Sequence, residues 1–148
     1  MQPVLTWDTY WLWSTHGLSQ YCGKNNIAYS KSSEHPESIE INLYAEDTEH
    51  VRRKVCATIT NRCLTIYGWD AGAEVATHYN GRCNVFEFWY ELNVENTKRL
   101  LTLLPGEDRN STKLLYGHFN GLDGCQKLEA FCKENEIEYR YNCESSHE

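Results

Sequence analysis

The first regular pattern along the chain lies between residues 7 and 22, where apolar side chains recur every three or four positions. This spacing aligns them along one side of an α-helix, so we predict an amphipathic helix here. Gly23, Asn25 and Asn26 follow at once, and residues of these types accept the left-handed backbone that ends many helices. The chain is then expected to form a short strand over 27–30.

Alternation of apolar and polar side chains, which is typical of a half-buried strand, begins after a polar loop at 31–38. Its inward-facing side chains are expected to be Ile39, Ile41, Leu43 and Ala45. Residues 51–70 predict a hairpin that turns at Asn61 and Arg62. In that register, one face pairs Ile59 with Leu64, Ala57 with Ile66 and Val55 with Gly68, and the other pairs Thr60 with Cys63, Thr58 with Thr65 and Cys56 with Tyr67.

The dipeptide Asn80-Gly81 is a strong hairpin signal, because both central residues of a type I′ turn need positive φ. It predicts that a strand over 74–79 pairs with a strand over 82–92. The expected core face holds Phe86, Phe88, Tyr90 and Leu92 together with Val75 and Thr77. The opposite face is expected to hold Cys83, Val85, Glu87, Trp89 and Glu91 together with His78, Ala76 and Glu74.

The apolar period of the remaining residues is that of helices. Asn93 is expected to cap a helix that Pro105 and Gly106 end, and Ser111 to cap a short helix over 112–119. Asp123 followed by Gln126 approximates a capping box for a helix that reaches residue 134. The side chains expected to be buried by that helix are Leu122, Cys125, Leu128, Phe131 and Cys132. A last alternating strand is expected to contain Ile137, Tyr139 and Tyr141.

These elements predict one α+β domain over residues 1–143, followed by an acidic C-terminal tail over 144–148. A chain of 148 residues is long enough to bury one sizeable core. The predicted architecture is an antiparallel sheet of about five to six strands. The N-terminal amphipathic helix and two or three later helices are expected to pack on one face of that sheet.

The charge balance narrows the classes of partner. The chain carries 14 Lys and Arg against 21 Asp and Glu, a net charge of -7. Such a chain gains no counterion-release affinity for nucleic acid, and its basic residues cluster only at Arg52, Arg53 and Lys54. Direct nucleic-acid binding is therefore disfavoured. A protein with a basic surface is the expected partner, because complementary fields speed encounter, although solubility is the simpler explanation of the charge.

The cysteines and the N-terminus indicate a cytoplasmic protein. The seven cysteines are odd in number and show no Cys-x-x-Cys spacing, so we interpret them as mostly free, buried thiols of a reducing compartment. The N-terminus has no basic region followed by an apolar run, as a signal peptide would. No stretch approaches the roughly 18 consecutive apolar residues of a membrane-spanning helix, so no membrane association is expected.

Metal and cofactor binding are not expected. Structural zinc sites pair their ligands about two to four residues apart, whereas Cys56 and Cys63, and likewise Cys125 and Cys132, are seven apart. The sequence also lacks the glycine-rich phosphate-binding motifs, the metalloprotease motif and the serine-hydrolase motif. These absences lower the expectation of an enzyme.

Two groups of residues remain as weak catalytic candidates. The predicted hairpin places His78 opposite Cys83, and an imidazole beside a thiol can activate it as a nucleophile. The same register places Glu74 opposite Glu87, with Glu91 nearby and Trp89 between them, as an acid and a base beside an aromatic platform would lie. The alternatives are an incidental cross-strand pair and a solvated outer face.

The aromatic content favours an interaction surface. Rings that cannot all fit inside a core of this size would serve as rigid anchors ringed by charge, although each ring alone is more readily explained by packing. The expected binding residues are Trp13, Tyr44, Tyr67, Trp69, Trp89, Glu87 and Glu91. Our first hypothesis is a small acidic protein that binds and inhibits a basic partner, as toxin-neutralising immunity proteins and phage inhibitors of host defence do. The alternatives are a domain that binds or converts a small molecule, carbohydrate or nucleotide, and a self-associating homodimer.

Overall fold

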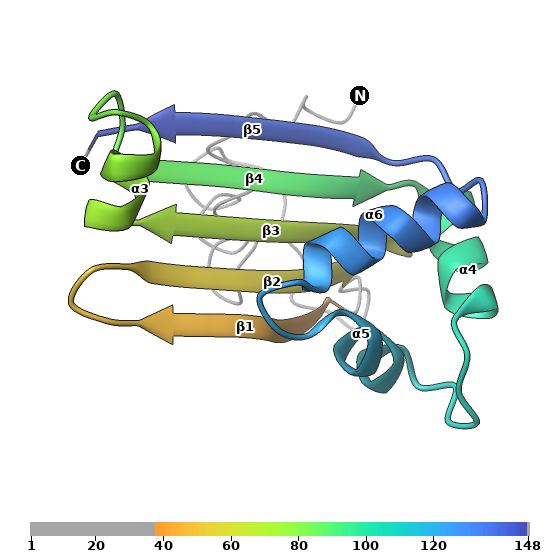
Figure 1. Ribbon diagram of the computed structural model, residues 1–148. Helices are drawn as coiled ribbons and strands as arrows, with labels where there is room; N and C mark the ends of the chain where they lie inside the picture. Colours follow the sequence, from red (N-terminus) through yellow and green to blue (C-terminus); the bar gives the residue numbers. More distant parts are fainter. Residues whose placement is uncertain (1–37, 148) are drawn as a thin grey trace, which may run out of the picture. The chain divides into compact units, whose positions relative to one another are not determined.

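Figure 1 shows the strands and helices of the computed structural model, which describes residues 38–147. Within this range, five antiparallel strands form one sheet in the order in which they occur along the chain. The strands are β1 Ile39–Asp47, β2 Arg52–Thr60, β3 Cys63–Ala71, β4 Val85–Leu92 and β5 Arg140–Ser146. The helices are α3 Ala73–His78, α4 Val94–Leu103, α5 Ser111–Phe119 and α6 Gly124–Glu134. The helix predicted at 7–22 and the strand predicted at 27–30 lie outside the described residues.

Helices α4, α5 and α6 pack on one face of the sheet, so the predicted α+β class is confirmed for the described part of the chain (Figure 1). Burial of apolar side chains from both layers stabilises this arrangement. The sheet contributes Ile41, Leu43, Ala57, Ile59, Leu64, Ile66, Tyr90 and Leu92, and the helical layer contributes Leu100, Leu104, Leu114, Leu115, Phe119, Leu128 and Cys132. Leu122, which was expected to be buried, is 66% exposed because it lies in the turn before α6.

The hairpin of β2 and β3 has the predicted register, and all six predicted pairs are present. Its two turn residues, Asn61 and Arg62, have φ values of 50° and 64°. Two consecutive residues with positive φ form the type I′ turn, whose twist matches that of the flanking strands. The turn therefore fixes which side chains of β2 and β3 face the helices.

The prediction of a strand over 74–79 is wrong, because residues 74–78 lie in helix α3 and Tyr79 caps its C-terminal end. Asn80 and Gly81 have the positive φ values that a hairpin turn would need, 54° and 73°. Here they end the helix instead: the Gly81 N–H donates to the Ala76 carbonyl at 2.7 Å, the bond that closes a helix before a left-handed residue. Consequently His78 does not face Cys83 across a ladder, and Glu74 does not face Glu87. Strand β4 pairs with β3 and β5.

Strand β1 contains a bulge that the alternating pattern did not predict. Its register against β2 shifts between Asn42 and Tyr44. An extra residue in a strand turns every later side chain to the other face. Tyr44 therefore faces the helix-bearing side, opposite Val55, whereas Ala45 is exposed rather than inward-facing as predicted.

The C-terminal half follows the predicted order of elements with different ends. The Asn93 side chain caps α4 as predicted, but α5 is capped by Asn110 rather than Ser111. Asp123 makes no capping hydrogen bond to α6 and pairs with Lys127 instead. Strand β5 begins three residues later than predicted and continues to Ser146, because β4 offers it pairing positions as far as Val85. Residues 144–146, predicted as part of a tail, are thus paired in the sheet.

Candidate functional site

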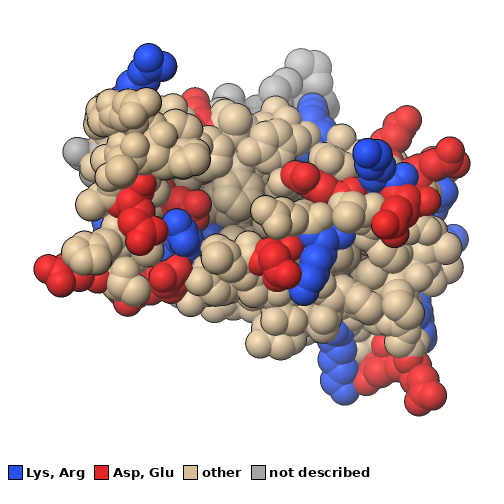
Figure 2. All heavy atoms as spheres, in the orientation of Figure 1, with Lys and Arg blue, Asp and Glu red and all other residues tan. Residues whose placement is uncertain are grey.

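Within residues 38–147, helices α4, α5 and α6 leave part of their own face of the sheet uncovered. The strand residues in the core with α4, α5 and α6 lie towards the end where β1 begins, and Figure 1 shows α3 at the opposite end. Between the two lie two rows of neighbouring residues across β1 to β4, which we call the open strip. The rows are Tyr44, Val55, Gly68 and Phe88, and Glu46, Arg53, Asp70 and Phe86. In Figure 2 this side of the molecule is hollowed, with acidic side chains near both ends of the hollow.

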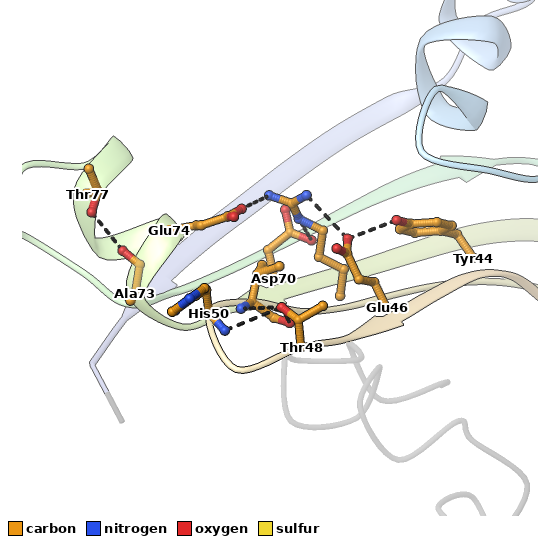
Figure 3. A network of polar contacts seen from close by, with 10 residues as sticks. Tyr44, Glu46, Thr48, His50, Asp70, Ala73, Glu74 and Thr77 are labelled. Carbon is orange, nitrogen blue, oxygen red and sulfur yellow. Dashed lines mark hydrogen bonds and ion pairs between the residues drawn. The ribbon is translucent and has the colours of Figure 1, made fainter.

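Arg53 lies at the centre of the polar half of the strip, among three carboxylates from different elements. Figure 3 labels their residues, Glu46, Asp70 and Glu74. Arg53 donates through Nη2 to Glu74 Oε2 at 3.2 Å, its Nη1 is 3.5 Å from Glu46 Oε2, and its Nε is 3.8 Å from Asp70 Oδ1. The carboxylates come from α3, β1 and β3 respectively. Helix α3, which replaces the predicted strand, is therefore what adds Glu74 to this group.

The three carboxylates outnumber the one guanidinium, and the site is partly withdrawn from water. Burial raises the pKa of Asp70, and the nearby Glu46 charge adds to this shift while Arg53 opposes it. The Tyr44 hydroxyl donates to Glu46 Oε2 at 2.9 Å, and this hydrogen bond raises the pKa of Tyr44. With its carboxylates ionised, the group carries a net charge of about -2, which favours a cationic ligand.

A row of aromatic rings runs beside the carboxylates. The rings of Tyr79 and Phe86 are stacked with centroids 5.5 Å apart, Phe86 and Phe88 follow at 6.0 Å, and Phe88 meets Tyr90 edge-on at 6.1 Å. Phe86 pairs directly with Asp70 across β4 and β3, so the row and the carboxylates share an edge. Tyr79, Phe86 and Phe88 are only partly buried. Aromatic surface next to ionised carboxylates is suited to a ligand that is both cationic and planar or apolar.

Most of the residues predicted to form a site lie on the opposite face of the sheet. Tyr67, Trp69, Trp89, Glu87 and Glu91 alternate with the strip residues along β3 and β4. Trp89 is only 3% exposed. Glu87 accepts a hydrogen bond from the Tyr67 hydroxyl at 2.5 Å, and Glu91 accepts from Arg140 Nε at 2.7 Å.

The predicted thiol and imidazole are not brought together. Cys83 is buried, whereas His78 is exposed at the end of α3 and its ring meets the edge of Tyr79 at 4.9 Å. Of the predicted residues, Tyr44 belongs to the open strip and Glu74 reaches Arg53 of the strip from α3, and Trp13 lies outside the described residues. Sequence reasoning missed Glu46, Asp70, Phe86 and Tyr79, and noticed Arg53 only as part of a basic run. The bulge in β1 and helix α3 bring these residues together. The pattern of apolar and polar side chains predicted neither of these two features.

A shallow groove of about 380 Å³ lies along β1, β2 and β3, lined by Ala45, Glu46, Asp47, Arg52, Arg53, Lys54 and Trp69. The Arg52 guanidinium lies 5.3 Å from the Trp69 ring centre. Among residues 38–147, no cluster of three or more His, Cys, Asp or Glu side chains has an arrangement that would hold a metal ion. In the same range, no helix combines the length and apolar character needed to cross a membrane.

Comparison of the chain with protein-family models, with curated proteins and with solved structures gave no match.

Proposed function

We propose that this domain binds and restrains a partner protein with a basic surface, and that it does so through the open strip. The observation that carries the proposal is the excess of carboxylates, three around one guanidinium, beside a row of half-buried rings on a part of the sheet face that the described helices do not cover. Immunity proteins and phage-encoded inhibitors act in this way, by occupying the surface of a protein that would otherwise be active.

Two physical effects support a protein partner. Aromatic rings held by a rigid sheet lose little side-chain entropy on binding, which is why such rings dominate the binding energy of many interfaces. The chain's net charge of -7 would steer a basic partner towards it and would make association sensitive to salt. The six cysteines of the described residues are free thiols, which supports our proposal of a reducing, cytoplasmic setting.

The alternative of a catalytic or small-molecule site beside Trp89 has less support. Glu87 and Glu91 each accept a hydrogen bond from a side chain of their own sheet, which occupies carboxylate oxygens that a substrate would need. The homodimer alternative draws support from exposed apolar side chains such as Tyr116 and Leu122. Light scattering over a range of concentrations distinguishes it, since a monomer at all concentrations would rule it out.

A charge-reversal pair tests the proposed surface. The double variant Glu46→Lys with Glu74→Lys changes two of the carboxylates around Arg53 of the strip. The control Glu107→Lys with Glu138→Lys makes the same change in net charge at two exposed positions elsewhere. Each protein is used to retain basic proteins from an extract of the source cells, and a retained protein is identified, purified and titrated at several salt concentrations.

We expect salt-sensitive binding by the wild type and by the control pair, and loss of at least tenfold in affinity for the strip pair. Equal affinities of the two double variants would place the interface elsewhere. Absence of any salt-sensitive binding by the wild type would overturn the proposed function itself.

A further inference from the structure

Arg53 is an imperfect occupant of the carboxylate group. Good contacts between guanidinium and carboxylate are about 2.7–2.9 Å long and are frequently bidentate. The three contacts of Arg53 are 3.2, 3.5 and 3.8 Å long, each to a different carboxylate, and only the one to Glu74 is a hydrogen bond. The Arg53 Nε is buried and makes no hydrogen bond. The carboxylates are thus oriented around a guanidinium without satisfying it.

The carboxylates also retain capacity to accept hydrogen bonds. Asp70 makes its one contact through Oδ1, at 3.8 Å, and Glu74 and Glu46 meet Arg53 through a single oxygen each. Their side chains are between 28% and 54% exposed, so an incoming group can reach them. A second cation bound here would reduce the net charge of the group from about -2 to about -1.

The adjoining rings distinguish between the two kinds of cationic side chain. Phe86, stacked on Tyr79, lies beside Asp70, so a group bound to this carboxylate also meets an aromatic face. A guanidinium is planar, stacks on rings and presents several donors in fixed directions, so it can meet a ring and two carboxylates at once. An ammonium group is a compact, strongly hydrated point charge and gains less from the ring.

We infer that the open strip receives an arginine side chain of the partner, with its guanidinium between Phe86 and the carboxylates of Asp70 and Glu74, and that Arg53 competes for the same carboxylates. This inference rests on the proposed function, because it names the chemical group that the strip recognises on a basic protein. Arg53 thereby weakens arginine binding while keeping the empty site from carrying three unopposed negative charges.

The test uses small probes with the full-length protein. N-acetyl-arginine amide, the corresponding lysine amide and the corresponding citrulline amide are titrated while amide chemical shifts are followed by NMR. Citrulline has nearly the shape of arginine and no charge. We expect saturable shifts at Arg53, Asp70 and Phe86 with arginine amide, at least threefold weaker binding of lysine amide, and no binding of citrulline amide.

Variants separate the roles of the residues. Glu74→Gln should weaken the binding of arginine amide about three- to tenfold. Phe86→Leu should reduce the preference for arginine amide over lysine amide. Arg53→Met should tighten binding about two- to fivefold because it removes the competitor. If the Arg53→Met protein does not fold, Arg53→Lys is used in its place. It should also bind arginine amide more tightly than the wild type, because a lysine ammonium competes less well than a planar guanidinium for these carboxylates.

The failures of the two proposals are distinguishable. Equal binding of arginine and lysine amides, shifts confined to residues outside the strip, or no gain on replacing Arg53 would overturn this inference even if a basic protein is retained. Specific arginine binding without any retained basic protein would support the guanidinium site and contradict the proposed function.

Discussion

The ring of Phe88 lies directly over Gly68, its partner across β3 and β4. An ideal Cβ added to Gly68 would be 2.0 Å from Phe88 Cζ and 2.4 Å from Cε1, well inside van der Waals contact. The ring therefore occupies the space that a side chain at position 68 would need. A glycine in a strand usually weakens it, and here the packing of the neighbouring ring offsets that cost.

Gly68→Ala is expected to destabilise the domain by about 1–3 kcal/mol, because the ring must leave its position to admit a methyl group. Chemical denaturation measures the change, and shifts of the Phe86 and Phe88 ring protons report the displacement. The matched control is Gly117→Ala in α5, where an added Cβ has no atom within 4 Å. That change should stabilise the domain by about 0.5–1 kcal/mol. A neutral or stabilising Gly68→Ala would show that the ring is not held as described.

Asp70 makes the stability of the domain depend on pH. Burial raises its pKa in the folded state, so the folded protein holds this proton at pH values at which the unfolded chain has lost it. Stability from this group therefore falls as the pH rises from the ordinary carboxyl pKa, about 3.9, through the raised value. We expect Asp70→Asn to remove this dependence, so the stability of the variant relative to the wild type should increase over that window and be constant above it. Urea denaturation between pH 3 and pH 7 measures the free energies of unfolding of both proteins. A decrease, with rising pH, in the stability of Asp70→Asn relative to the wild type would contradict this prediction.

Thr97 joins α4 to two strands through one buried hydroxyl. It accepts a hydrogen bond from the Leu64 N–H at 2.9 Å and donates to the Leu92 carbonyl at 3.2 Å. Thr97→Val keeps the shape and leaves both backbone groups unpaired in the interior, which should cost about 2–4 kcal/mol. Thr102→Val, on the exposed side of the same helix, is the control and should change stability by less than about 0.5 kcal/mol. Similar losses for the two variants would argue against the buried hydrogen bonds.

How far the sequence predicts the fold is best seen in two pairs of residues with positive φ. Asn61-Arg62 and Asn80-Gly81 both adopt left-handed backbone, and both are predicted from the sequence to be hairpin turns. Only the first is one. A left-handed residue also ends a helix, so local conformation alone does not decide between a hairpin and a helix end. The six residues of α3 are too few for their period to decide, and the choice is made by packing of Val75 and by pairing of β4 with β3.

The sequence predicted the kinds of residue in the candidate site but not their arrangement. Acidic excess and surplus rings were visible in the composition, but the face on which they gather depends on the β1 bulge, which moves Tyr44 and Glu46 to the helix-bearing side. Strict alternation would have placed both on the other face. Bulges are specified by a local disruption of the strand ladder and leave little trace in the apolar pattern of one sequence. The site therefore required the three-dimensional structure.

The cysteines should differ sharply in their reactivity, in an order set by burial. Burial raises the pKa of Cys125 to about 12, with the nearby Glu129 charge adding to the shift, and burial raises that of Cys132 to about 11. The thiolate is the reactive form, so at pH 8 these two residues should react only after the domain unfolds. Cys143, which is exposed on β5, should be alkylated first among the described cysteines. Mass spectrometry of peptides after timed alkylation gives the order, with Cys143→Ser as the control that removes the first product. Labelling of Cys132 in the native protein as fast as that of Cys143 would mean that α6 opens readily from the sheet.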